Sequence, residues 1–169
     1  MKSSFRAARL AANSLLCCVL LTASAGWLAA QTPATPTPAP TEATSTLTLN
    51  ITGIRNAKGK IGVVLFRDGK GFPSDVTYAV AARQGAIDPQ TLTAKVVFEK
   101  LAQGVYAAAV LHDENLTGKM EFDSQGIPQS GYGISNNPDT TQGPPTPEQA
   151  IFPVKQPEAT IEIKMVYWQ

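Results

Sequence analysis

Cysteine is scarce in this chain, and its two copies lie outside the part that can fold into a domain. Cys17 and Cys18 both fall in an apolar N-terminal segment, and the residues before them lack the small side chain expected ahead of a lipid-modified cysteine. The rest of the chain therefore has no thiol. This excludes a disulfide framework, a cysteine nucleophile and a thiolate metal site, so stability must come from an apolar core.

Histidine and runs of positive charge are also sparse. His112 is the only histidine, which gives too few nitrogen ligands for a zinc site. No G-x-S-x-G motif supplies a serine that it could activate. Without Lys2, Arg6 and Arg9, 11 basic residues stand against 13 acidic ones, a net charge of about −2. With no basic cluster for phosphate groups, nucleic acid is excluded as a partner.

The first 30 residues have the layout of a secretory signal peptide. Three basic residues precede an uncharged apolar stretch over residues 10–30, and small residues allow cleavage after Ala25 or after Ala30. The alternative is an uncleaved membrane anchor, since the stretch is long enough to span a bilayer. Either interpretation predicts an exported protein, in the periplasm or at the cell surface, with no membrane contact if the signal is removed.

A spacer over residues 31–45 follows, and it reads QTPATPTPAPTEATS. This Pro/Thr/Ala tract has one charge and no large apolar residue, so it cannot bury a core and is expected to be extended and disordered. Residues 46–169 then have the length of a single domain with its own core.

Alternating apolar and polar residues dominate this domain and predict β-strands. The stretches TLTLNITGI, KIGVVLFR, TLTAKVVFEKL, GVYAAAVLHD and ATIEIKMVYW each fit a strand, the second as a central strand because it is apolar on both faces. No segment combines helical periodicity with caps over three turns. The pattern predicts an all-β fold, an antiparallel β-sandwich of about seven strands.

The connections between these strands lead to three further expectations. The turn at residues 56–59 and the turn at Gln103-Gly104 are each expected to close a hairpin between the strands on either side. Residues 76–83 fit either a strand or a short helix. Residues 119–147 are too polar and too rich in Gly and Pro for a core strand, and long loops of this kind are more often functional than idle.

The acidic stretch HDENLTGKMEFD, residues 112–123, carries the candidate metal site. Asp113, Asn115, Thr117 and Glu121 occupy alternating positions of a D-x-[DN]-x-[DN]-G loop, with Gly118 at the glycine, and Asp123 lies one residue before the loop's last ligand position. Such oxygen donors suit calcium. The competing interpretation is a turn in which Asp113 and Asn115 bond their own backbone and Gly118 is left-handed.

Four residues are candidates for a ligand surface: His112, Tyr132, Asn136 and Asn137. Tyr132 lies among glycine and polar residues, as an aromatic platform for a sugar or peptide would, although a tyrosine that covers the end of a sandwich explains it as well. The partner would be an envelope or extracellular ligand or protein. The alternative function is a glycan or peptide hydrolase that uses the carboxylates of the same loop.

The order of several motifs resembles a known family. GKIGVVLFRDGKGFP, then VVFEKLAQGVYAAAVLHDENLTGKMEFDSQGIPQSGYGISNN, then QAIFPV and a last strand closely resemble the bacterial exported family catalogued as domain of unknown function 2141. The resemblance implies a small secreted β-sandwich, transthyretin-like or immunoglobulin-like. It implies no reaction, so we expect a non-enzymatic binding or structural module.

Overall fold

The computed structural model describes residues 44–141 and 143–168. The predicted signal peptide and nearly all of the predicted spacer lie outside these residues, and the first strand begins at Thr44. In chain order the elements are β1 (Thr44–Thr52), β2 (Lys60–Arg67), η1 (Val76–Tyr78), β3 (Ala79–Gly85), β4 (Ile87–Asp88), β5 (Thr93–Ala102), β6 (Gly104–Asp113), β7 (Gly131–Ile134), α1 (Pro147–Ala150), β8 (Phe152–Val154) and β9 (Glu158–Lys164). None of the helices in these ranges is long and apolar enough to cross a membrane.

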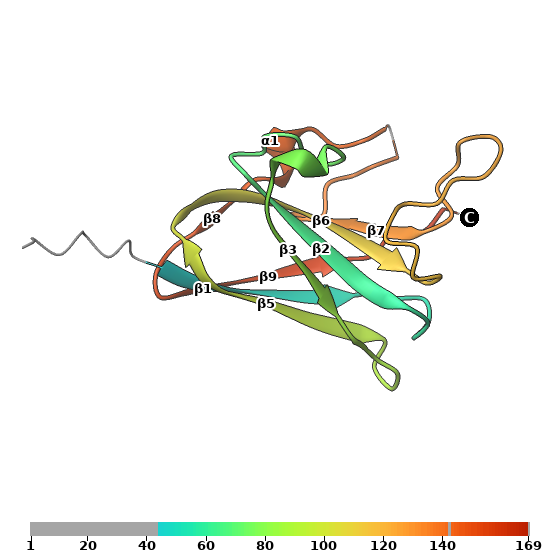
Figure 1. Cartoon of the computed structure of the whole chain (residues 1–169), viewed down its shortest axis with the longest axis horizontal. Helices are drawn as coiled ribbons and strands as arrows, with labels where there is room; N and C mark the ends of the chain where they lie inside the picture. Colours follow the sequence, from blue (N-terminus) through green and yellow to red (C-terminus); the bar gives the residue numbers. More distant parts are fainter. Residues whose placement is uncertain (1–43, 142, 169) are drawn as a thin grey trace, which may run out of the picture. The chain divides into compact units, whose positions relative to one another are not determined.

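Two sheets pack face to face, which confirms the predicted all-β sandwich (Figure 1). One sheet has the order β4-β5-β1-β9, and the other has the order β3-β2-β6-β7 with β8 also paired to β6. The alternation of β1 explains its place, because Leu47, Leu49 and Ile51 are fully buried between the sheets. Nine strands are formed within the described residues, two more than expected, and the extra ones are short.

One pair of strands departs from the antiparallel arrangement that the sequence predicted. β9 runs parallel to β1, with Thr46 opposite Glu158 and Thr52 opposite Lys164. All the other strand pairs are antiparallel. The parallel pair arises because β9 enters from the connection after β8, at the same end of the sandwich where β1 begins (Figure 1).

Both predicted hairpins are wrong, because each turn carries the chain from one sheet to the other. β1 pairs with β5 and β9, whereas β2 pairs with β3 and β6. The segment between β1 and β2 crosses the sandwich because Ile54, at 3% exposure, joins the core. β5 and β6 are likewise in different sheets, and the left-handed backbone of Lys100 (φ 56°) bends the chain into that corner.

The two remaining connections resolve as follows. Residues 76–83 form the 3-10 turn η1 and most of the edge strand β3. The expectation of no core strand in residues 119–147 is wrong, because β7 lies there and pairs with β6. β2 is central in its sheet, as predicted, and its outer face is covered by a second small apolar cluster of Phe66, Phe72, Ala107, Ile134 and Ala150.

Candidate functional site

Four of the five predicted metal ligands, Asn115, Thr117, Glu121 and Asp123, lie at one end of the sandwich, which we call the loop end and define as residues 53–59, 114–130 and 165–168. The three segments are the β1–β2 crossing, the long β6–β7 connection and the C-terminal tail after β9. Hydrogen bonds join them. The Arg55 guanidinium donates to the carbonyl of Gln129 (3.3 Å), and the backbone N–H of Arg55 donates to the Tyr167 hydroxyl (3.1 Å).

Asp113, the last residue of β6, organises the first turn of the long connection. Its side chain is almost buried, with 7% exposure of the residue. Oδ1 accepts the backbone N–H of Thr117 at 2.8 Å, and Oδ2 accepts that of Gly118 at 2.7 Å. Gly118 has a left-handed backbone (φ 75°). These bonds agree with the turn interpretation for Asp113 and Gly118, whereas Asn115, which that interpretation also bonded to its own backbone, donates to Glu121 instead.

The other candidate metal ligands make separate hydrogen bonds. The Asn115 amide donates to Oε2 of Glu121 at 2.7 Å. Asp123 Oδ1 accepts the N–H groups of Gln125 and Ile127, both at 2.9 Å, and so closes its own turn. Within residues 44–141 and 143–168, no three His, Cys, Asp or Glu side chains are grouped so that they could hold a metal ion.

His112 lies on the inner face of β6 and is fully buried. Its Nε2 lies 2.8 Å from the carbonyl oxygen of Lys58, which can only accept, so Nε2 carries the proton and donates it. In the neutral ring Nδ1 is then an acceptor, and it lies 2.8 Å from the Tyr167 hydroxyl. The buried imidazole thus has a partner on each nitrogen, and it ties β6 to the crossing and to the tail.

An ion pair covers this imidazole on the solvent side. Arg55 donates through Nε to Oε1 of Glu114 and through Nη2 to Oε2 at 3.0 Å. The hydrogen bond from Arg55 holds the pKa of the Glu114 carboxyl below its ordinary value, against the effect of burial. Burial raises the pKa of the Tyr167 hydroxyl, so the phenol stays protonated over the physiological range. The Glu114 carboxylate also accepts a hydrogen bond from the Asn56 side-chain amide (3.2 Å).

Arg55 and Tyr167 were not predicted to be members of this group. Arg55 follows β1 and Tyr167 lies three residues after β9, so only the folded chain brings them to His112. One sequence signal was available: the two glycines of GYGI, Gly131 and Gly133. A Cβ on Gly131 would lie 2.1 Å from the Tyr167 ring, and one on Gly133 would lie 2.8 Å from Ile163. Both glycines leave room for the C-terminal segment.

The predicted ligand-surface residues have different roles. Asn136 donates to the carbonyls of Gln149 and Ile151, and Asn137 bonds the outer edge of β9 through the Glu162 carbonyl and the Lys164 N–H. Both amide side chains are therefore committed to backbone groups, and both residues have left-handed backbones (φ 65° and 49°), which asparagine tolerates better than most residues.

A small depression lies beside Tyr132, between β7 and β9. Its volume is about 130 Å³, which is below the range of sites for whole small molecules but suits one ring or side chain. It is lined by Tyr132, Ile134, Asn137, Pro138, Thr140, Lys164 and Val166. A second hollow of about 480 Å³, between the β1–β2 crossing and the β3–β4 turn, has no aromatic side chain in its lining.

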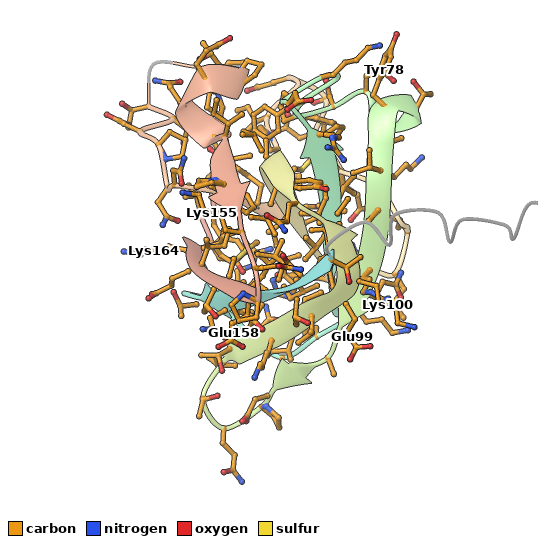
Figure 2. The ribbon with its side chains drawn as sticks, turned by 90° about the vertical axis from the view of Figure 1, so that its left-hand side faces the viewer. Tyr78, Glu99, Lys100, Lys155, Glu158 and Lys164 are labelled. Atoms are coloured by element: carbon orange, nitrogen blue, oxygen red, sulfur yellow. The ribbon has the colours of Figure 1, made fainter. Side chains whose placement is uncertain are left out.

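Exposed apolar side chains are concentrated at the loop end. Five of the ten large apolar residues exposed in the described structure lie on its two outer segments: Leu116, Phe122, Ile127, Val166 and Trp168. Phe122 and Trp168 are 59% and 51% exposed. The opposite end of the sandwich differs, because there the exposed side chains of Glu99, Lys100 and Lys155 project outward (Figure 2). Scattered apolar residues are ordinary, whereas a concentration of them marks a contact surface.

Comparison with known proteins gives a family and nothing beyond it. The profile of the family described as "Uncharacterized protein conserved in bacteria (DUF2141)" matches residues 49–162, which is more than half of the chain. No curated protein and no solved structure matches the chain.

Proposed function

The chain belongs to the DUF2141 family, and we propose that it is an exported, non-enzymatic β-sandwich module that binds an envelope or extracellular partner through its loop end. The observation that carries the proposal is the concentration of exposed apolar side chains on residues 114–130 and 165–168. Burial of such surface against a partner stabilises a complex by roughly 25 cal/mol per Å² before the costs of association.

The backbone of the loop end is held in place, which favours binding over a passive linker role. The Asp113 carboxylate fixes the start of the long connection, and Asp123 fixes its tip. The ion pair of Arg55 and Glu114 fastens its base. A surface that is already ordered loses less conformational entropy when a partner binds. Leu116, 62% exposed, is held in a left-handed conformation (φ 59°) at the loop surface, where it is available to a partner.

Export is the second part of the proposal, and it rests on the sequence of residues 1–30. Three basic residues, the apolar stretch and the alanine sites form the signal. The absence of any thiol after Cys18 suits a fold that needs no oxidation step. N-terminal sequencing of the protein recovered from the periplasm or medium should begin at Gly26 or Gln31. Recovery only from the cytoplasm with Met1 or Lys2 intact would contradict export.

Co-sedimentation with isolated envelope material tests the binding surface. Peptidoglycan sacculi and outer-membrane vesicles would each be mixed with the purified chain and with the double variant Phe122→Ser/Trp168→Ser. We expect the wild type to be retained by one of the two materials and the variant to lose most of this retention.

A matched control pair lies on η1 and on the edge strand β3. Val76 and Val80 are 61% and 51% exposed, close to the values of Phe122 and Trp168, but they lie in η1 and β3, two residues before and after Tyr78. Val76→Ser/Val80→Ser should leave retention unchanged. Equal loss in both double variants, or no retention of the wild type by either material, would contradict the proposal.

A further inference from the structure

The Tyr167 ring sits in a close-fitting site made by the rest of the chain. Its face lies under the guanidinium of Arg55, 4.8 Å from the ring centroid, and the centroid of the His112 ring lies 6.0 Å away in a T-shaped arrangement with an interplanar angle of 81°. On another side the ring presses on the backbone of β7, where Gly131 leaves space that any side chain would fill. We call Arg55, His112, Glu114 and Gly131 the phenol socket.

The socket also recognises the hydroxyl group. Tyr167 Oη accepts the N–H of Arg55 at 3.1 Å and pairs with Nδ1 of His112 at 2.8 Å. In the neutral imidazole, whose Nε2 donates to the Lys58 carbonyl, Nδ1 is left as an acceptor and the hydroxyl donates to it. A benzene ring without the hydroxyl would leave a buried acceptor without a partner, which is costly. The chemistry therefore selects phenols over other aromatic rings.

The socket groups are held in position by residues other than Tyr167. The carbonyl of Lys58 orients the imidazole. Glu114 and the carbonyl of Gln129 hold the Arg55 guanidinium in the plane that faces the ring. A site whose groups are fixed by second partners keeps its geometry when its occupant leaves, and such preorganisation favours rebinding.

Outside this one side chain, the tail after Met165 is attached to the sandwich by one isolated β-bridge. After β9 ends, Val166 exchanges two backbone hydrogen bonds with Tyr132 (2.7 and 3.0 Å), while the side chains of Val166 and Trp168 are exposed. We propose that the phenol socket is a binding site for para-substituted phenols, either a tyrosine side chain or a free phenolic compound, which the chain's own Tyr167 occupies in the free protein. This inference does not depend on the proposed function, since it concerns the socket and not the exposed apolar surface.

The test compares the intact chain with a chain that ends after Met165. p-Cresol, toluene and the dipeptide N-acetyl-Val-Tyr-amide are titrated into both, and binding is followed by the NMR shifts of the His112 ring nitrogens and the Gly131 amide. In the shortened chain p-cresol should bind about tenfold more tightly than toluene, because the hydroxyl bonds are worth about that factor. The intact chain should bind p-cresol at least about tenfold more weakly, because its own tail competes.

Two further comparisons identify the source of the phenol and the place where it binds. Tighter binding of the dipeptide than of p-cresol assigns the socket to tyrosine-bearing segments, through the backbone bonds to Tyr132; weaker binding assigns it to free phenols. In the shortened chain Gly131→Ala should abolish p-cresol binding, whereas the control Gly62→Ala, whose added Cβ would meet nothing closer than 4.0 Å, should not.

The proposal is overturned if toluene binds as well as p-cresol, if the intact and shortened chains bind p-cresol equally, or if Gly131→Ala has no effect. If the shortened chain does not fold, the full-length variant Tyr167→Ala replaces it, since the backbone bonds between Val166 and Tyr132 remain. Its thermal midpoint should then rise more with p-cresol than with toluene, and equal shifts would again refute the socket.

Discussion

The Asp113 carboxylate offers the sharpest test, because it separates a turn held by hydrogen bonds from a turn held by an ion. Its two oxygens accept N–H groups at 2.8 and 2.7 Å in a nearly buried place. A hydrogen bond to a charged group contributes about 1.5–3 kcal/mol, and two bonds to one group are not fully additive. We expect Asp113→Ala to lower the free energy of unfolding by about 3 kcal/mol, or the midpoint by about 10 °C.

The isosteric variant refines this expectation. In Asp113→Asn one oxygen can still accept the N–H of Thr117, but the amide NH₂ then faces the N–H of Gly118, two donors together. The loss should therefore be at least half of that for alanine. Asp88 is the matched control, since Oδ1 also accepts two backbone N–H groups, from Gln90 and Thr91, but in a fully exposed turn. Asp88→Ala should therefore lower the free energy of unfolding clearly less than Asp113→Ala does.

Urea denaturation and thermal melting of the wild type and the three variants, each with calcium chloride and with EGTA, provide the measurement. The hydrogen-bond account predicts equal wild-type midpoints in the two conditions, because the bonds to Asp113 are already made. A calcium-dependent rise of several degrees that disappears in Asp113→Ala would refute this account and establish an ion in its place. So would a variant Asp113→Ala that melts with the wild type.

Three other predictions follow from the loop end and the second apolar cluster. Tyr167→Phe should lower the free energy of unfolding by about 1–3 kcal/mol in urea denaturation, because it leaves Nδ1 of the buried His112 without a donor, whereas Tyr78→Phe should change nothing. Glu114 has a folded-state pKa below its ordinary value of 4.5, so its contribution to the free energy of unfolding is complete above pH 4.5 and is lost as the pH falls through the folded pKa. Curves of this free energy against pH should therefore differ between wild type and Glu114→Gln at pH 7 and converge in acid. Parallel curves would contradict this prediction. Ser135→Ala should cost about 1–3 kcal/mol by the same urea measurement, since the fully buried Oγ accepts from Ala108 N–H at 2.9 Å and donates to the Ala150 carbonyl at 2.6 Å.

The sequence predicted the strands better than it predicted their partners. The alternation in β1 and the apolar run of β2 record which faces of each strand are buried. A short stretch of sequence is enough to show this, so the strands could be predicted. Hairpin or crossing, in contrast, depends on whether the next strand finds its partner in the same sheet. Gln103-Gly104 suits a corner as well as a turn, so composition alone could not decide. β7 was missed because Gly131 and Gly133, which suggest a loop, make room for the C-terminal segment instead.

The candidate site was predictable only where its contacts are close in sequence. The turn at Asp113 spans five residues, and its spacing suggested both interpretations that we weighed. The phenol socket joins Arg55, His112 and Tyr167 across more than 100 residues of chain, and no single-sequence pattern records such a pairing. Asn136 and Asn137 were predicted to face a ligand, but their side chains bond backbone groups instead. The cause is similar, since those backbone groups lie on segments that only the fold brings close to them.

The parallel pairing of β1 with β9 has a consequence for how this chain is made. The ribosome makes β1 long before β9, so the edge of β1 that β9 will cover stays open until residues 158–164 have emerged. A nascent or prematurely stopped chain that lacks residues 158–164 would present a bare strand edge, the kind of template on which other chains aggregate. β9 then takes the place of β1 at the edge of this sheet, so its arrival is what protects β1 during synthesis.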